Sequence, residues 1–282
     1  MRALVESARR KRSVLVAGLD PSPGRLPEEI RNLELPEDRA VYEFCRGILE
    51  AVEPEVAAVK LQAAYFERLG PAGMGVYSRL ISDAKTLDLP VIADVKRGDI
   101  GPVAAAYAEA HLETYGATCV TVNPYMGADA VLPFLETSRR QGAGGGVFSL
   151  VATSNPSAAA LQDATEPPLY EVAARLVSEL GEAGGTGYAD LGAVVGVTRP
   201  EVGVRVREML PRALFLSPGY GAQGGGAGEV RPLLDAAGGG VLVNSSRGIL
   251  YAYEASGLGY REAAAEAARN AREDLASVGA GM

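Results

Sequence analysis

Short apolar runs rich in β-branched residues recur along this chain of 282 residues, and longer amphipathic stretches separate them. The runs are too short for helices and are apolar throughout, as strands buried on both faces of a parallel sheet are. They occupy residues 13–19, 56–61, 90–95, 118–123, 147–153, 193–198, 213–218 and 240–245. Between them, apolar residues recur three and four apart, which predicts helices over 41–51, 77–87, 128–140, 169–180 and 201–210.

Eight strands that each precede a helix predict a (β/α)8 TIM barrel, and the length suits a fold that takes about 250 residues. We therefore expect a single α/β barrel domain over residues 1–282, with its active site at the carboxyl-terminal face of the strands. The alternative is a doubly wound open sheet, which more often carries a GxGxxG turn after its first strand. Here that turn reads GLDPSPG, residues 18–24, and favours the barrel.

The charge balance limits the classes of partner. The formal net charge is −8 and the pI is about 4.9, so no excess of lysine and arginine exists to neutralise a nucleic acid or an anionic membrane. The amino-terminal segment lacks a signal-peptide core, and no stretch approaches the ~20 apolar residues of a membrane span. These features predict a cytoplasmic protein with no nucleic-acid or membrane partner, and they leave room for a local basic pocket.

The single histidine and the two cysteines narrow the possible chemistry. His111 lies in an alanine-rich stretch typical of a helix, and we expect it to serve packing. A His/Cys metal cluster is therefore not expected, and a Ser-His-Asp triad would need His111. Cys45 and Cys119 lie in apolar contexts and are expected to be buried free thiols.

The stretch VIADVKRGDIG, residues 91–101, places charged residues directly behind an apolar run. Asp94 and Lys96 are two apart on a predicted strand, so their side chains point the same way. A polar residue at the carboxyl end of a barrel strand is in position to be catalytic. Such residues stand at most of the predicted strand ends: Asp20, Lys60, Asp94, Lys96, Asp99, Asn123, Thr153, Ser154, Gln223 and Arg247. Two aspartates and two lysines at one barrel mouth form an alternating charge array, which is costly to bury unless the charges pair.

The loops after the last two predicted strands have the features of an anion site. In barrels these loops frequently form a phosphate cradle. The segment SPGYGAQGG, residues 217–225, offers backbone N–H groups that few side chains obstruct, and Arg247 offers a two-pronged donor. The combination predicts a ligand that carries a phosphate group.

Six segments in order, GLD, VKLQ, DVKRGDI, TVNPYMGAD, SPGYGAQGG and NSSRGI, make the chain resemble orotidine 5′-phosphate decarboxylase, especially its longer bacterial branch. The resemblance covers nearly the whole chain, and DVKRGDI is its most specific motif. It implies decarboxylation of orotidine 5′-phosphate to uridine 5′-phosphate (UMP), the last step of UMP synthesis, by a homodimer without a metal or organic cofactor. The sequence agrees with the last point, because it offers no histidine cluster and no nucleotide-binding glycine fingerprint.

Carried over by position, the resemblance implies a role for each candidate residue. Lys96 protonates the carbon that loses carbon dioxide, Asp94 lies beside the departing group, and Lys60 belongs to the same charge array. Asp99 reaches across the dimer into the partner's site. The implied substrate contacts are Asp20 and Lys60 to the ribose, Ser154 to the pyrimidine, Gln223 and Arg247 to the phosphate, and Asn123, Pro218, Ser246 and Gly248 among the other binding residues.

Two positions differ from the pattern of the family or align less clearly. Val103 stands where many relatives have a threonine, so the hydroxyl contact of that threonine across the dimer is lost. Around ATSNPS, residues 152–157, Thr153 is an alternative to Ser154 as the pyrimidine contact.

Three other functions are alternatives. A sugar-phosphate decarboxylase or synthase of the same barrel superfamily shares the acid-x-lysine-x-x-acid strand but needs magnesium. Arg97 in KRGD favours an enzyme that acts on orotidine 5′-phosphate over this alternative. A class I aldolase would use Lys60 or Lys96 as a Schiff base, but a lysine between two aspartates is not activated for that role. A non-catalytic protein that binds a phosphate ligand has no use for the full charge array.

Overall fold

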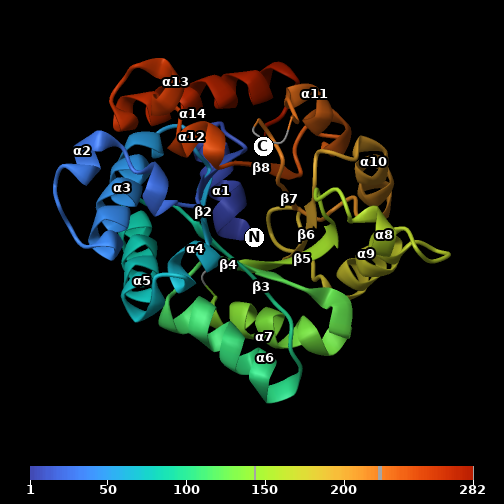
Figure 1. Cartoon of the computed structure of the whole chain (residues 1–282). Helices are drawn as coiled ribbons and strands as arrows, with labels where there is room; N and C mark the ends of the chain where they lie inside the picture. Colours follow the sequence, from blue (N-terminus) through green and yellow to red (C-terminus); the bar gives the residue numbers. More distant parts are fainter. Residues whose placement is uncertain (143, 222–223, 282) are drawn as a thin grey trace.

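The computed structural model describes residues 1–142, 144–221 and 224–281. Eight parallel strands form a closed barrel in which each strand pairs with the next along the chain and β8 pairs with β1. Figure 1 looks along the barrel, with the strands at the centre and the helices around them. The strands are β1 (Leu15–Leu19), β2 (Ala58–Gln62), β3 (Val91–Arg97), β4 (Cys119–Val122), β5 (Gly146–Ala152), β6 (Leu191–Val195), β7 (Phe215–Ser217) and β8 (Val241–Ser245). The predicted TIM barrel is confirmed, and every predicted strand overlaps an observed one.

Helices follow the strands and cover the outside of the barrel. The α-helices are α1 (Arg2–Lys11), α2 (Glu28–Arg31), α3 (Glu37–Val52), α4 (Ala64–Glu67), α5 (Gly70–Thr86), α6 (Gly101–Ala108), α7 (Leu132–Gln141), α8 (Ala159–Gln162), α9 (Leu169–Leu180), α10 (Pro200–Met209), α11 (Ala227–Val230), α12 (Arg247–Leu250), α13 (Tyr253–Ser256) and α14 (Tyr260–Ser277). Shorter helical segments are η1 (Pro23–Arg25), η2 (Glu109–Thr114), η3 (Pro124–Met126), η4 (Ala128–Ala130) and η5 (Arg231–Leu233). The five helices predicted from periodicity correspond to α3, α5, α7, α9 and α10. Within the described residues, no helix is both long and apolar enough to cross a membrane.

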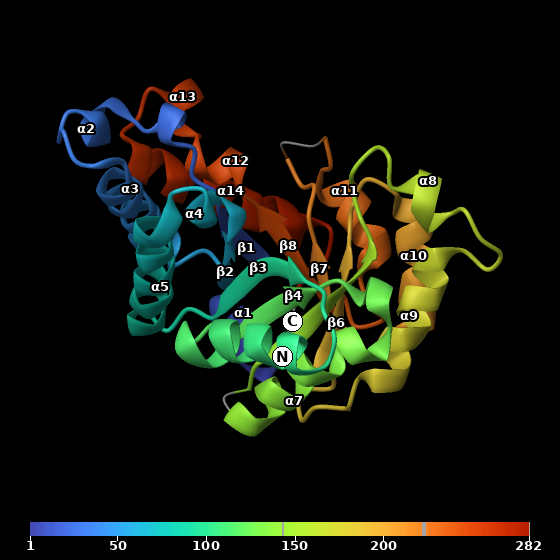
Figure 2. The same cartoon turned by 60° about the horizontal axis from the view of Figure 1, so that its bottom comes forward.

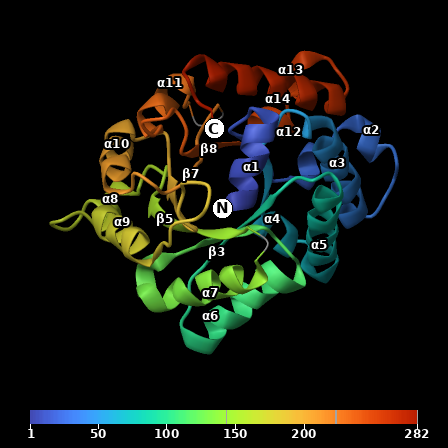
Figure 3. The ribbon, with the colours of Figure 1, turned by 180° about the vertical axis from the view of Figure 1, so that it is seen from behind.

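The inside of the barrel is apolar at the amino-terminal end of the strands. Helix α1 lies across this end (Figure 3) and closes it with its apolar face. One buried cluster joins the chain start to the strands: Met1, Leu4, Val5, Ala8, Val16, Ala57, Ala58, Ile92, Cys119, Phe148, Val194, Leu214, Leu216 and Leu242. This end of the barrel is therefore a packed core and not a channel.

Toward the carboxyl end, the side chains on the inner face become polar. Successive side chains of a strand point to opposite faces, so residues two apart share the inner face. On that face Ala58 is followed by Lys60 and Gln62, Ile92 by Asp94, Cys119 by Thr121, and Leu242 by Asn244 and Ser246. Figure 2 shows α8, α12 and α13 at this end of the molecule. The barrel thus builds a polar mouth on an apolar base.

Strand β3 is irregular near its carboxyl end. Its register against β4 shifts between Ala93 and Arg97, and Lys96 has a φ of 46°, in the left-handed region. Thr121 Oγ1 on β4 accepts hydrogen bonds of 3.0 Å from the backbone N–H groups of Val95 and Lys96. Irregularities of this kind redirect side chains, and here the Lys96 ammonium group lies against the carboxylate of the nearby Asp94.

Candidate active site

A cavity of about 350 Å³ opens at the carboxyl-terminal end of the strands. Segments far apart in sequence meet there, because the walls come from the ends of β1, β2, β3, β7 and β8. The lining residues are Asp20, Lys60, Gln62, Tyr65, Asp94, Pro218, Gly219, Tyr220, Asn244, Ser246 and Arg247. Six of them are candidates from the sequence: Asp20, Lys60, Asp94, Pro218, Ser246 and Arg247.

Lys60 joins two carboxylates in the wall of this cavity. Its Nζ atom lies 3.0 Å from Oδ2 of Asp94 and 3.3 Å from Oδ1 of Asp20. On the other side of Asp94, Oδ1 forms an ion pair with Nζ of Lys96. The four charges therefore form one chain in the order aspartate, lysine, aspartate, lysine, and each lies next to a charge of opposite sign.

Burial and pairing act in opposite directions on the two innermost charges. Burial favours the neutral form of Lys60, but Asp20 and Asp94 outweigh it and raise the pKa of Lys60 above its ordinary value. Burial likewise acts to raise the pKa of Asp94, yet Lys60 and Lys96 outweigh it and hold that pKa well below its usual range. Both groups are therefore charged at neutral pH.

The carboxylate of Asp94 accepts two hydrogen bonds on each oxygen. Oδ1 accepts from Lys96 Nζ and, at 3.0 Å, from Thr121 Oγ1. Oδ2 accepts from Lys60 Nζ and, at 3.1 Å, from Gln62 Nε2. Gln62 and Thr121 were missed in the sequence, although the alternation of side chains could have found them, because each lies on the inner face of its strand.

Lys96 is the most exposed member of the array, although it is not among the residues that line the 350 Å³ cavity. Its side chain is 42% exposed, against 6% for that of Lys60. Its ammonium group is held on the Asp94 side and open on the other. This geometry suits a proton donor that must meet a reacting atom.

A second wall comes from the residues after β8, the strand that pairs with β1. Ser246 precedes helix α12, and Arg247 is the first residue of that helix. Gly18 on β1 makes room for this segment, because a Cβ atom there would lie 2.0 Å from Ser246 Oγ and 3.0 Å from Asn244 Oδ1. Gly248 follows on α12, is exposed, and lies outside the lining of the cavity.

The segment after β7 supplies the third side. Tyr220 lines the cavity, and its hydroxyl donates a hydrogen bond of 2.6 Å to Asp274 on α14, which ties the start of the glycine-rich loop to the body of the barrel. Gln223, predicted as a phosphate contact, lies outside the described residues.

Besides Lys96 and Gly248, three more predicted site residues are absent from the lining of this cavity. Asp99 stands in the loop before α6, where its Oδ1 accepts a hydrogen bond from the next backbone N–H, and it joins no ion pair within the described part of the chain. Asn123 is exposed, and its side chain caps η3 by accepting from the N–H of Tyr125. Ser154 lines a separate cavity of about 530 Å³ on the same face, together with Arg199.

The loop after β5 is held by its own side chains. The Thr153 hydroxyl donates to Asn155 Oδ1 at 2.6 Å and accepts from Gln162 Nε2 at 2.7 Å. Arg199 pairs with Asp163 of this loop at 2.6 Å. Because the Thr153 hydroxyl is already used in both directions, the geometry favours Ser154 over Thr153 as a ligand contact.

His111 and the two cysteines are buried and do not line the cavity. His111 Nδ1 lies 3.3 Å from the hydroxyl oxygen of Tyr77, and burial lowers the pKa of His111 to about 4. Cys45 and Cys119 are free and buried, and burial raises the pKa of both thiols. Among the described residues, no group of three or more His, Cys, Asp or Glu side chains is placed to hold a metal ion.

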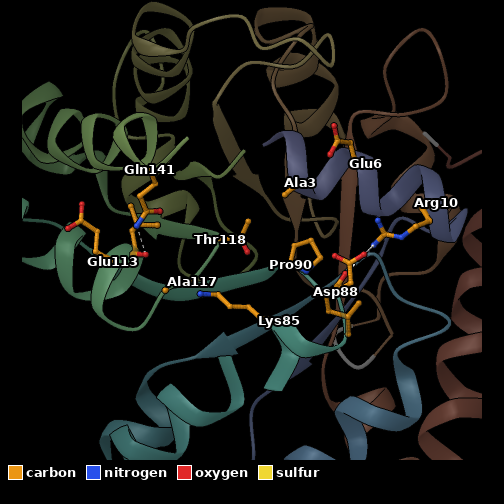
Figure 4. Close-up of a pocket in the computed structure, with 13 residues that line it drawn as sticks. Ala3, Glu6, Arg10, Lys85, Asp88, Pro90, Glu113, Ala117, Thr118 and Gln141 are labelled. Atoms are coloured by element: carbon orange, nitrogen blue, oxygen red, sulfur yellow. Dashed lines mark hydrogen bonds and ion pairs between the residues drawn. The ribbon is translucent and has the colours of Figure 1, made fainter. Parts of the chain in front are cut away.

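A further cavity of about 510 Å³ lies at the amino-terminal end of the barrel (Figure 4). Its lining includes Arg10 on α1, Asp88 and Pro90 before β3, and Thr118 before β4. Arg10 and Asp88 form an ion pair of 3.0 Å, so their charges neutralise each other. Active sites of such barrels form at the opposite face, and this cavity is therefore not the candidate site.

Comparisons with known proteins point to one family. The sequence model of the orotidine 5′-phosphate decarboxylase / HUMPS family matches residues 14–268. A Rhodopirellula baltica protein named orotidine 5′-phosphate decarboxylase is 44% identical over 262 residues, which cover 87% of this chain and 86% of the relative. A Clostridium kluyveri protein of the same name is 38% identical over 284 residues, which cover 98% and 96%. A solved Toxoplasma gondii structure, assigned as an orotidine-monophosphate decarboxylase, has a TM-score of 0.84 and 34% identity, covering 98% of this chain and 94% of that one.

Proposed function

The chain belongs to the orotidine 5′-phosphate decarboxylase / HUMPS family, and from this membership we propose how its residues perform the reaction. The reaction is the decarboxylation of orotidine 5′-phosphate to UMP, a carboxy-lyase step of pyrimidine synthesis. One observation carries the proposal for the residues: Asp20, Lys60 and Asp94 line the cavity and form one ion-paired chain that Lys96 extends.

Lys96 is the general acid in this proposal. The bond between the pyrimidine carbon and the carboxylate breaks, its electron pair stays on the ring carbon, and carbon dioxide leaves. The Lys96 ammonium group donates a proton to that carbon, and the neutral amine regains a proton from water. The ring offers no electron sink at this carbon, so a fixed positive charge beside it supplies the stabilisation, and no metal or organic cofactor is needed.

Asp94 holds the Lys96 ammonium group in place through their ion pair, and Lys60 holds the Asp94 carboxylate from its other side. Repulsion between Asp94 and the substrate carboxylate is a smaller effect, because two like charges at ~4 Å and an effective dielectric constant of about 20 cost about 4 kcal/mol. That energy corresponds to about three decades of rate, whereas difficult reactions need about 10 to 20 decades. We therefore assign the larger share to Lys96 and to binding energy from the phosphate.

The remaining candidates bind the substrate in this proposal. Asp20 and Lys60 contact the ribose hydroxyls, which their place in the cavity lining supports. Arg247 holds the phosphate as a charge-assisted donor. Pro218, Gln223, Ser246 and Gly248 complete the phosphate side, and Asn123 and Ser154 belong to the binding surface on the pyrimidine side.

We also propose that the enzyme works as a homodimer in which Asp99 enters the partner's site. Near Asp99 in the chain and on the following segments, large apolar side chains are exposed at the start of α6, on α6 and on η3: Ile100, Val103, Tyr107, Tyr125 and Met126. Exposed apolar patches of this kind mark protein–protein interfaces. Val103 contributes apolar contact area there in place of a hydroxyl.

The whole chain, residues 1–282, acts as one domain in the cytoplasm in this proposal. Helix α14, near the end of the chain, packs against α3, near its start, so unfolding is expected to occur in a single transition. The buried free thiols of Cys45 and Cys119 suit a reducing compartment. Calorimetry and cell fractionation test these two points.

The test of the function follows orotidine 5′-phosphate by ultraviolet absorbance in buffer treated with a chelator, with wild type beside Lys96→Ala. We expect loss of substrate absorbance with wild type and none with the variant. Turnover by wild type that needs magnesium and a sugar phosphate would instead assign the chain to the synthases of the same superfamily. Borohydride trapping with a carbonyl substrate would reveal an aldolase.

A further inference from the structure

We propose that Thr121 is a positioning residue of this reaction, whose hydroxyl holds the Asp94 carboxylate and the backbone of Lys96 in one arrangement. The inference rests on the proposed role of Lys96 as the proton donor. Thr121 lies on β4 and is completely buried, so it reaches no substrate and acts only through its neighbours.

The Thr121 hydroxyl uses its full hydrogen-bonding capacity. It accepts from the N–H groups of Val95 and Lys96 and donates to Oδ1 of Asp94, each at 3.0 Å. A hydroxyl has one donor and two acceptor lone pairs. No other side chain in the described part of the chain contacts both the Asp94 carboxylate and the backbone N–H of Lys96.

The backbone at Lys96 needs such support. Its φ of 46° is strained for a residue with a long side chain, and strain of this kind persists only where the surroundings impose it. The register shift between Ala93 and Arg97 breaks the regular pairing with β4. The hydroxyl supplies an acceptor to the backbone N–H groups of Val95, which is buried, and of Lys96, which is partly buried.

The Thr121 Oγ1 atom therefore fixes both the backbone of Lys96 and the carboxylate that binds its ammonium group. The backbone N–H of Lys96 donates a hydrogen bond to Thr121 Oγ1. The ammonium group of Lys96 pairs with the Asp94 carboxylate, to which Thr121 Oγ1 also donates a hydrogen bond. A displacement of about 1 Å at a reacting group costs about 10²-fold in rate. Loss of this hydroxyl should therefore lower kcat and leave ligand affinity nearly unchanged.

Thr118, the residue just before β4, provides a matched control between the same two segments of the chain. Its Oγ1 accepts a hydrogen bond of 3.0 Å from the N–H of Val91, at the amino-terminal end of β3. Thr118→Val thus removes the same kind of threonine-to-backbone bond far from the charge array.

The experiment compares Thr121→Val, Thr121→Ser and Thr118→Val for kcat and KM with orotidine 5′-phosphate and for the Kd of UMP. We expect Thr121→Val to lower kcat about 30-fold or more while the Kd of UMP stays within about threefold. Thr121→Ser should keep kcat within about fivefold, and Thr118→Val within about twofold. A Thr121→Val enzyme that keeps kcat within about threefold, or loses UMP affinity in proportion to kcat, overturns the proposal.

Two further results keep the inference testable if Thr121→Val does not fold. Thr121→Ser and Thr121→Cys place groups of similar size in the site, but a thiol is a weak donor and acceptor. The serine enzyme should be at least about tenfold faster than the cysteine enzyme, and equal rates overturn the proposal. If wild type fails to decarboxylate orotidine 5′-phosphate, the proposed function is wrong. If Lys96→Ala retains turnover, Lys96 is not the general acid. Either result can be distinguished from a failure of the inference about Thr121.

Discussion

The Nζ atom of Lys60 lies 3.0 Å from Oδ2 of Asp94, and both side chains are more than nine-tenths buried. Removal of either charge would leave the other without one of its counter-charges in the protein interior, where solvent and salt screen charges only weakly. The pair therefore couples the stability of the fold to the chemistry of the site, because Asp94 also holds Lys96.

Asp94→Asn is expected to lower the free energy of unfolding at pH 7 by about 3 kcal/mol, because it leaves a buried lysine partly uncompensated. The pKa of Asp94 is lower in the folded than in the unfolded protein, so its stabilisation is present above about pH 4 and is lost as pH falls below that. Urea unfolding at a series of pH values should show the gap between wild type and variant narrowing below about pH 4. The exposed Asp88 serves as control, since Asp88→Asn should change stability by less than about 0.5 kcal/mol.

Arg247→Ala is expected to lower kcat/KM for orotidine 5′-phosphate about 10²-fold, although Arg247 touches no reacting atom. This change corresponds to a loss of about 3 kcal/mol of transition-state stabilisation. The reason is that binding energy from the phosphate contributes to the transition state. Orotidine, which lacks the phosphate, should react equally slowly with wild type and variant. A loss below about 1 kcal/mol with the phosphorylated substrate would contradict the proposed grip.

Asp99 is expected to act across the dimer, which a mixing experiment can decide. Lys96→Ala and Asp99→Ala should each be inactive alone. After subunit exchange in an equal mixture, half of the dimers are hybrids with one intact site, so about a quarter of wild-type activity should return. If Asp99 serves the site of its own chain, the mixture stays inactive.

The stability of the fold should depend on pH through His111. Burial lowers the pKa of His111 to about 4, below that of the unfolded chain, so the unfolded state binds the extra proton first. Stability is then full above about pH 6.5 and falls by up to about 3 kcal/mol as pH decreases to about 4. Chemical unfolding of His111→Gln should lack this part of the pH dependence, and an unchanged slope would show that other groups cause it.

Arg207 is expected to stabilise the fold and to play no part in turnover. Its buried guanidinium donates to the carbonyl oxygens of Leu233, Leu210, Ala213 and Gly240. Burial lowers the pKa of Arg207 to about 10. Arg207→Met removes all four hydrogen bonds and should cost about 3 kcal/mol, measured by urea unfolding, with kcat unchanged. Arg205→Met, which removes an exposed ion pair with Glu171, is the control and should cost less than about 1 kcal/mol.

The strands and the main helices could be predicted because their signals are local. Apolar runs such as 90–95 and the amphipathic stretch 169–180 carry the periodicity of the element that they form. Residue type at the strand ends also placed Asp20, Lys60 and Asp94 at one barrel mouth. Helix α7 begins at Leu132, later than predicted, because residues 128–130 form η4.

Other parts of the site could not be predicted from the sequence. Alternation places Gln62 and Thr121 on the inner face of their strands, but it does not show that both bind the Asp94 carboxylate, which depends on how β2, β3 and β4 pair. Ser154 follows a strand as Asp20 does, yet it lines a different cavity. The strained backbone of Lys96 has no signal in its residue type, because lysine rarely adopts a positive φ.

The sequence by itself determined the barrel, the face that carries the site and the chemical types of the charged residues, since each follows from periodicity or from position at a strand end. Only the tertiary structure decided which charges pair and which neighbours hold them. The register between strands that are some thirty residues apart is set by packing and closure of the barrel. That register alone brings Thr121 Oγ1 to the Asp94 carboxylate and Lys60 between two aspartates.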